Sequence, residues 1–211
     1  IDFMDKNSII TVEKFKKCNL KTDMEAMLLI NIDGFECSID YQQENVIKAL
    51  QDSGAKFIEV AKSEEQKEKI WTARRASFAA TAQLAPDVIS DDIIVPRSKI
   101  TQMINECCDI YSKYNLKVCM VGHLGDGNLH PQVALDLDND EQFKNYRQAK
   151  SEIYNLVIKL GGTISAEHGV GIEKLAYLEG LVESSAIDKM KEIKQVFDPK
   201  NILNPNKIFN I

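Results

Sequence analysis

The stretch LKVCMVGHLGDGNLHPQVALD, residues 116–136, decides the expected fold. Apolar residues dominate both of its ends, so 116–121 and 131–136 are each predicted to form a strand. Three glycines between these two runs allow the backbone to turn sharply. We therefore expect two consecutive strands, joined by a glycine-rich loop that brings His123 and His130 to one point.

Predicted strands and helices continue on both sides of this pair. A strand over 88–95 and a helix over 98–114 precede it, and a helix over 139–160 and a strand over 162–166 follow it. The resulting order, βαββαβ, is that of a ferredoxin-like unit. The expected fold class is therefore α+β, with a ferredoxin-like antiparallel sheet covered by helices.

The N-terminal part of the chain is expected to extend this sheet. Its predicted elements are a strand over 27–32, a helix over 38–53, a strand over 56–61 and a helix over 63–83. Half of a second ferredoxin-like unit is the alternative, and we favour one continuous sheet. A C-terminal helical segment is expected as well, but 197–207 contains two prolines that exclude a helix across it.

Composition and charge exclude several classes of protein. The formal net charge is −6 and the 26 Lys and Arg residues are scattered, so no nucleic-acid partner is expected. No apolar run approaches the roughly 20 residues of a membrane span, and the acidic start is unlike a signal peptide. We expect a cytoplasmic protein, or one held peripherally at the inner membrane by a partner. The five cysteines, with no Cys-x-x-Cys pair, are expected to be reduced structural thiols.

All three histidines fall in two short motifs, GHLGDGNLH at 122–130 and AEHGVG at 166–171. Imidazole suits metal ligation and proton transfer near neutral pH, so His123 and His130 are a candidate ligand pair. The alternative is a hairpin whose histidines only form local hydrogen bonds. Asn128 in the same motif could contact a substrate, whereas Asp126 could simply brace the loop.

Glu167 and His168 are adjacent, and adjacent side chains of a regular strand face opposite ways. They can share a site only if the strand ends there, and the two glycines of the second motif provide such an ending. Glu167 could then complete a set of two histidines and one carboxylate, which suits zinc, manganese or iron, while His168 turns toward a substrate. The alternative is a solvated acid beside a helix-capping histidine.

Arg74 and Arg75 follow Trp71 in the predicted helix over 63–83. A guanidinium group matches a carboxylate bidentately, so one of these arginines could bind a substrate acid. An exposed arginine on a charged helix is the alternative, and composition does not separate the two.

Four motifs together resemble the C-terminal domain of FAD-linked oxidases, the family of glycolate oxidase flavoprotein subunits and of D-lactate and D-2-hydroxyglutarate dehydrogenases. They are WTAR at 71–74, GHLGDGNLH at 122–130, SAEHGVG at 165–171 and DPKNILNPNK at 198–207. The resemblance implies one domain over 1–211, with the N-terminal FAD-binding domain absent from this chain. Asn206 departs from the family pattern, which usually has glycine there.

The resemblance also implies roles at the matching positions. His123, His130 and Glu167 would bind a divalent metal, and His168 would be the general base. Arg74 would bind the carboxylate of a small 2-hydroxy acid, and Asn204 would lie near FAD. Because FAD would be held mainly by the missing domain, this fragment alone is expected to be inactive; an electron-transfer subunit is a further expected partner.

Three functions remain open at this point. The first is the substrate- and metal-binding domain of an FAD-dependent dehydrogenase that oxidises a D-2-hydroxy acid, of the glycolate or D-lactate class, to the 2-oxo acid. The second is a stand-alone hydrolase whose metal, held by the same His/His/Glu set, activates water. The third is a non-catalytic assembly module. A hydrolase would turn over without flavin, which distinguishes it from the first function.

Overall fold

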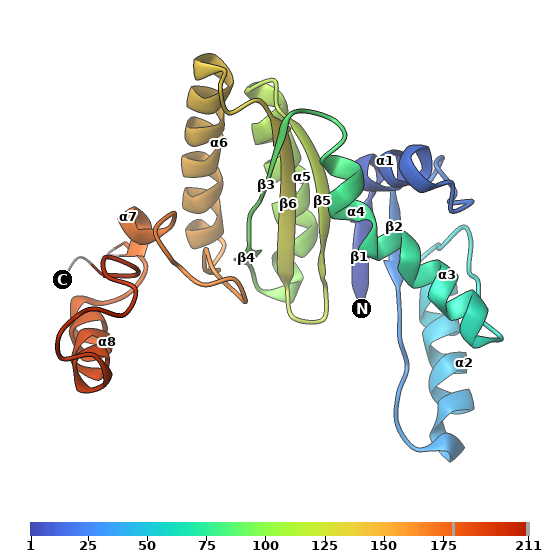
Figure 1. Cartoon of the computed structure of the whole chain (residues 1–211). Coiled ribbons are helices and arrows are strands. Elements are labelled where there is room, and N and C mark those ends of the chain that lie inside the picture. The colour runs from blue at the N-terminus through green and yellow to red at the C-terminus, as the bar shows by residue number, and fades with distance from the viewer. Residues whose placement is uncertain (179, 210–211) are drawn as a thin grey trace.

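The computed structural model describes residues 1–178 and 180–209, and its centre is a six-stranded antiparallel sheet. The strands lie in the order β2-β1-β5-β6-β3, with the short β4 also paired to β6 (Figure 1). Their bounds are β1 Asp2–Asp5, β2 Ala26–Leu29, β3 Asp87–Ser90, β4 Ile93–Ile94, β5 Lys117–His123 and β6 Asn128–Leu135. The α+β fold class is confirmed.

From β3 onward the described elements follow the ferredoxin-like order βαββα, but the final strand of that order is absent. Helix α5, Ile100–Lys113, follows the 3-10 turn Arg97–Lys99, and helix α6, Asp140–Lys159, follows β6. The strand predicted over 162–166 is wrong, because this segment keeps a single bridge between Thr163 and Ile94. Beyond that bridge, the N–H groups of Ala166 at its end and of Glu167 and His168 after it donate to the carboxylate of Asp92 instead of a neighbouring strand.

The predicted strand over 88–95 is divided into β3 and β4. Asp91 and Asp92 interrupt it, and both side chains are buried. The loop between the central strands is also shorter than predicted, because β5 continues to His123 and β6 already begins at Asn128. Both histidines of the first motif therefore lie within strands rather than in the loop.

The N-terminal part adds two elements that were not predicted, β1 and helix α1, Lys6–Lys16. β1 lies between β5 and β2, so the expected extension of the sheet is confirmed. Helix α2, Glu36–Asp52, agrees with the prediction. The strand predicted over 56–61 is wrong, since these residues form no strand or helix and the side chain of Phe57 is exposed.

The helix predicted over 63–83 divides at Ala76 into α3, Glu64–Arg75, and α4, Ser77–Thr81. The division lets α4 pack against α1 while α3 runs outward (Figure 1). Ser63 caps α3, since its side chain accepts the N–H of Gln66. Arg74 thereby occupies the last turn of a helix that ends beside β1.

The two faces of the sheet are covered differently. Helices α5 and α6 pack on one face over a large apolar core, and α1, α3 and α4 cover part of the other face over a smaller one. Helices α7, Leu175–Leu178, and α8, Ser184–Phe197, lie apart from the sheet with a small cluster of their own (Figure 1). Within the described residues, no helix is both long and apolar enough to cross a membrane.

Candidate active site

The pairing register of β1, β5 and β6 brings polar residues of the candidate site opposite one another. Asp2 of β1 lies opposite His123 of β5, and His123 lies opposite Asn128 of β6. His130 lies opposite Val121, on the same sheet face as His123, because alternate residues of a strand face the same way. The glycine-rich hairpin thus brings the two histidines of the first motif together by strand pairing, with ring centroids 5.4 Å apart.

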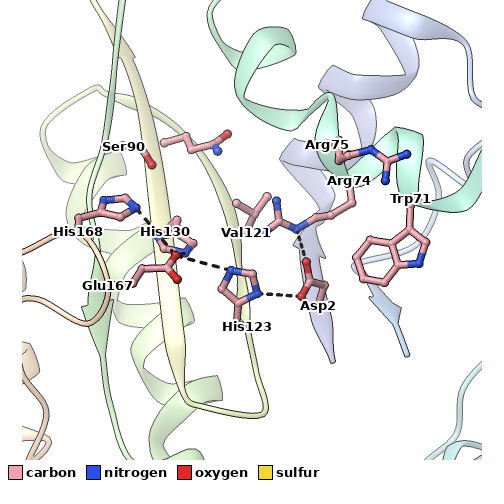
Figure 2. Close-up of a pocket in the computed structure, with 11 residues that line it drawn as sticks. Asp2, Trp71, Arg74, Arg75, Ser90, Val121, His123, His130, Glu167 and His168 are labelled. Atoms are coloured by element: carbon pink, nitrogen blue, oxygen red, sulfur yellow. Dashed lines mark hydrogen bonds and ion pairs between the residues drawn. The ribbon is translucent and has the colours of Figure 1, made fainter. Parts of the chain in front are cut away.

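A cavity of about 390 Å³ lies over this face, between α3 and the loop that follows α6 (Figure 2). Helix α3 supplies one wall, the sheet supplies the floor, and the loop supplies the opposite wall. The lining residues are Asp2, Trp71, Arg74, Arg75, Ser90, Val121, His123, His130, Gln132, Glu167 and His168.

Glu167 is the centre of the site. Its Oε1 atom lies 3.0 Å from Nε2 of His130, 3.7 Å from Nε2 of His123 and 3.9 Å from Nε2 of His168. The ring of His168 stacks on that of His130, with centroids 5.1 Å apart. The two sequence motifs thus form one composite site, as predicted.

The hydrogen bonds of His130 fix the state of its ring. Nδ1 lies 3.2 Å from the carbonyl oxygen of Asp91, which can only accept, so Nδ1 carries the proton and Nε2 keeps its lone pair. Burial lowers the pKa of His130, and the nearby Asp91 carbonyl and the Glu167 carboxylate offset this only in part. A neutral imidazole whose lone pair points at Glu167 is suited to bind a cation.

Asp2 connects the histidines to Arg74. Its Oδ1 atom lies 2.8 Å from Nδ1 of His123, and this carboxylate therefore directs the other ring nitrogen toward Glu167. Its Oδ2 atom lies 3.0 Å from Nε of Arg74. The two groups form an ion pair, but the N–H of Nε does not point at the oxygen well enough to form a hydrogen bond. Arg74 thus brings to the edge of the cavity a largely buried guanidinium group that is paired with Asp2.

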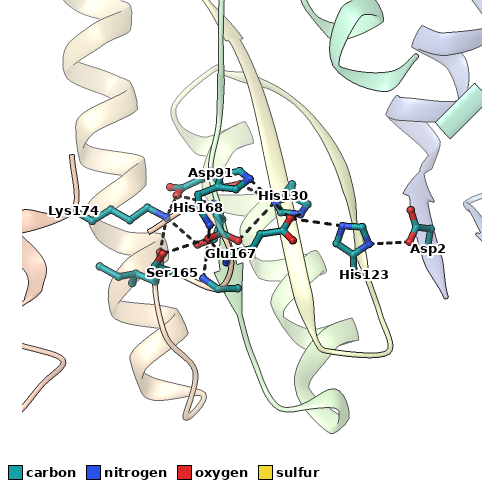
Figure 3. Close-up of polar contacts among 11 residues, drawn as sticks. Asp2, Asp91, His123, His130, Ser165, Glu167, His168 and Lys174 are labelled. Carbon is teal, nitrogen blue, oxygen red and sulfur yellow. Dashed lines mark hydrogen bonds and ion pairs between the residues drawn. The ribbon is translucent and has the colours of Figure 1, made fainter. Parts of the chain in front are cut away.

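A buried polar network behind the cavity was not predicted (Figure 3). Lys174 donates to the carbonyl oxygens of Asp92 and Ile164, and forms an ion pair with Asp91 at 3.1 Å. Asp91 also accepts the hydroxyl of Tyr154 at 3.0 Å. Two adjacent acids inside an otherwise apolar predicted strand were the sequence signal that could have revealed this network.

Four residues offer ligand atoms that all lie within 4.8 Å of one another: Asp92, His130, Glu167 and His168. His130 and Glu167 belong to the predicted set, whereas His123 lies just outside this group. The nitrogen and carboxylate donors fit a zinc, manganese or iron ion. The facing lone pairs of His130 and Glu167 support this fit, since a cation between them would remove their repulsion.

Two predicted site residues do not line the cavity. Asn128 is buried at the start of β6, and its Oδ1 atom has no hydrogen-bond partner in the described structure. Asn204 does not line the cavity either and belongs to the turns after α8, a segment that lies apart from the sheet (Figure 1). Asn206 adopts φ +57°, a conformation that glycine favours and asparagine tolerates, which explains the departure from the family pattern.

The cysteines play no part in the cavity. All five are free thiols, and Cys107 is buried in α5, with Cys108 partly buried beside it. Burial raises the pKa of both thiols, that of Cys108 to about 11. They are therefore structural rather than nucleophilic.

Solved structures define the class of fold to which this chain belongs. It is similar to 4-ethylphenol oxidase from Gulosibacter chungangensis, with a TM-score of 0.60 and 11% identity over 98% of this chain and 46% of that chain. It is also similar to p-cresol methylhydroxylase, with a TM-score of 0.56 and 10% identity over the same shares. The chain is thus an α+β domain of the kind that forms about half of these longer proteins.

The family follows from the sequence match. The family model described as FAD linked oxidases, C-terminal domain, matches residues 1–208, and the chain belongs to this family. The resemblance inferred from the four motifs is confirmed.

Curated relatives include enzymes named for three 2-hydroxy acids. The glycolate oxidase subunit GlcD of Bacillus subtilis is 39% identical over 99% of this chain and 44% of its own length. A probable mitochondrial D-lactate dehydrogenase of Danio rerio is 29% identical over 100% of this chain and 42% of its own length. A D-2-hydroxyglutarate dehydrogenase of Stutzerimonas stutzeri is 34% identical over 71% of this chain and 33% of its own length. The chain spans less than half the length of these relatives.

Proposed function

We propose that this chain is the substrate- and metal-binding domain of an FAD-dependent dehydrogenase that oxidises a D-2-hydroxy acid to the 2-oxo acid. The convergence of three imidazole nitrogens on Oε1 of Glu167, with Arg74 on the same cavity, is the observation that carries the proposal. Glycolate and D-lactate are the proposed substrate class, because the relatives above are named for these acids and for hydroxyglutarate.

The proposed roles divide the cavity into two parts. His123, His130 and Glu167 would hold a divalent metal, which when bound lowers the pKa of a coordinated hydroxyl group. Arg74 would bind the substrate carboxylate by a charge-assisted hydrogen bond. This places the hydroxyl near the histidines and the acid group toward α3.

His168 is the proposed general base. Its ring is half-exposed on the cavity, and its Nε2 atom could take the hydroxyl proton as hydride leaves the substrate carbon. FAD, held mainly by a separate FAD-binding domain, would accept that hydride. Asn204 is still proposed to lie near FAD, which would require the C-terminal segment to face the other half of the protein.

The partner of this domain is proposed to be an FAD-binding domain, on the same full-length chain or on a separate one. An electron-transfer subunit is a second proposed partner, since the Bacillus relative is named as a subunit of glycolate oxidase.

Anaerobic stopped-flow absorbance of the complete FAD-containing enzyme tests the proposal. Glycolate or D-lactate should bleach the flavin, and L-lactate should not. Turnover of an ester or amide by this chain without flavin would instead favour the stand-alone hydrolase. Because the first result depends on flavin and the second excludes it, the two functions are separated.

A further inference from the structure

The loop that carries Glu167 and His168 is held in an unusual way. Three consecutive N–H groups, those of Ala166, Glu167 and His168, donate to one oxygen, Oδ2 of Asp92, at 2.8, 2.9 and 2.9 Å (Figure 3). The hydroxyl of Ser165 lies 3.4 Å from the same oxygen. Successive N–H groups converging on one anion form a nest, so the carboxylate takes the place of the strand that the sequence predicted here.

Asp92 itself is rigidly held. Its side chain is fully buried between β3 and β4, and its backbone carbonyl accepts Nζ of Lys174 at 2.9 Å. Burial alone would raise the pKa of Asp92, but the N–H donors and Lys174 hold this pKa below its ordinary value. Because Lys174 also donates to the carbonyl oxygen of Ile164 at 2.6 Å, the same cation connects the base of the loop to the segment between β3 and β4.

We propose that Asp92 is a positioning residue, whose carboxylate fixes the backbone of 166–168 so that Glu167 and His168 meet the histidines of the sheet. Asp92 does not line the cavity, and its Oδ2 atom accepts the loop N–H groups, so it acts through these two residues rather than on a substrate. Direct metal ligation by Asp92, which its place in the group of four allows, would weaken zinc binding in Asp92→Asn without speeding exchange of the loop amides. The inference rests on the proposed function of the site, and it adds a residue that the motifs did not include.

The geometry requires a carboxylate at this position rather than an amide. Oδ1 of Asp92 is buried without a hydrogen-bond partner and lies 3.9 Å from Nδ1 of His130, which carries a proton. An asparagine would turn its NH₂ group either toward this N–H or toward the three N–H groups of the loop. With NH₂ toward the loop, donors would face donors; with the amide oxygen toward the loop, the three N–H groups would keep an acceptor that has lost its negative charge. In either orientation Asp92→Asn should loosen the loop without leaving a cavity.

The first experiment measures hydrogen–deuterium exchange of single amides by NMR on the purified chain. In the unsubstituted chain, the amides of Ala166, Glu167 and His168 should be protected like those of the β5–β6 ladder. Asp92→Asn should speed their exchange about 10- to 100-fold relative to that ladder, the loss expected for hydrogen bonds to a charged group.

Asp5→Asn is the matched control. Asp5 is also buried, and its Oδ1 atom accepts the N–H and hydroxyl of Ser8 and the N–H of Met120. This variant also replaces a buried carboxylate, but it should leave the exchange of 166–168 unchanged relative to the ladder. Unprotected loop amides in the unsubstituted chain, or equal acceleration in both variants, would overturn the proposal.

Zinc titration by calorimetry supplies a second readout that a purely structural role would not change. Asp92→Asn should weaken zinc binding about 10- to 100-fold, as loss of an outer-shell partner typically does, and Asp5→Asn should not. Unchanged zinc affinity in Asp92→Asn would contradict a positioning role. If the unsubstituted chain binds none of zinc, manganese and iron, the metal site of the proposed function fails in this chain, and the exchange measurement still decides the role of Asp92. If Asp92→Asn does not fold, protection of the amides of 166–168 in the unsubstituted chain decides whether Asp92 holds this loop.

Discussion

Nε2 of His130 and Oε1 of Glu167 lie 3.0 Å apart, and the hydrogen bond from His130 to Asp91 leaves a lone pair on that nitrogen. A carboxylate oxygen also offers only lone pairs, so the contact is repulsive unless a proton or a metal ion lies between them. The pair therefore identifies the part of the cavity where a cation would be bound most strongly.

Replacing His130 with alanine should remove the metal. Elemental mass spectrometry of the purified chain should find about one zinc, manganese or iron ion per chain, and close to none in His130→Ala, because a neutral imidazole ligand is lost. Asp126→Ala is the control, since Asp126 is exposed in the turn between β5 and β6. Equal metal content in all three proteins would refute the assignment of His130.

His123 and His168 should behave differently, although both face Glu167. His123→Ala should lose metal, whereas His168→Ala should keep it and slow flavin reduction in the complete enzyme about 10²- to 10⁴-fold, the usual contribution of a general base. The measurements are metal content and anaerobic stopped-flow absorbance. Metal loss in His168→Ala would make His168 a ligand, as its place beside Asp92 and His130 also allows.

Arg74 and Arg75 form a natural comparison, because they are adjacent on α3 but have different surroundings. Arg75 pairs with Glu68 in solvent, while Arg74 is largely buried beside Asp2. Arg74→Ala should lower kcat/KM of the complete enzyme roughly 10- to 100-fold through loss of a charged hydrogen bond, and Arg75→Ala should change it little. Arg74→Lys should not restore it, since lysine lacks the planar fork. Equal effects of the two alanine variants would contradict a substrate role for Arg74.

The glycine-rich hairpin should tolerate a side chain at one glycine and not at another. A Cβ atom at Gly127 would lie 2.1 Å from the carbonyl oxygen of Val95, and Gly127 has φ +81°. Gly127→Ala should therefore cost about 3 kcal/mol of the free energy of unfolding, measured in urea. Gly125→Ala, which meets nothing within 4 Å, should change this free energy by less than about 0.5 kcal/mol. Similar stabilities of the two variants would contradict the close approach of the Val95 carbonyl to Gly127.

Thiol reactivity should separate the cysteines by burial and pKa. At pH 8, iodoacetamide should label the exposed Cys37 first, as read by peptide mass spectrometry. Cys108, with a pKa of about 11, has less than about one part in a thousand as thiolate at that pH, and the thiolate fraction rises only as the pH approaches 11. Labelling of Cys108 as fast as that of Cys37 at pH 8 would contradict the packing of α5.

The core of the fold could be predicted because its signals are local. Strands β5 and β6 and helices α5 and α6 each have their own apolar periodicity, and glycines mark the turn between the strands. The prediction for 56–61 failed since a short apolar run specifies a strand only when a partner strand is available to pair with it.

The sequence by itself indicates that the three histidines and Glu167 share one site, because these residues combine metal-binding chemistry with glycine-rich turns. Tertiary structure alone decided which residues support them. Asp2 reaches His123 from 121 positions away, and Asp92 reaches His168 from 76 positions away. A buried charge is stabilised by whichever partners the fold brings to it. The adjacent acids at 91–92 indicate a buried charge in the sequence, but they do not indicate which distant residues it contacts.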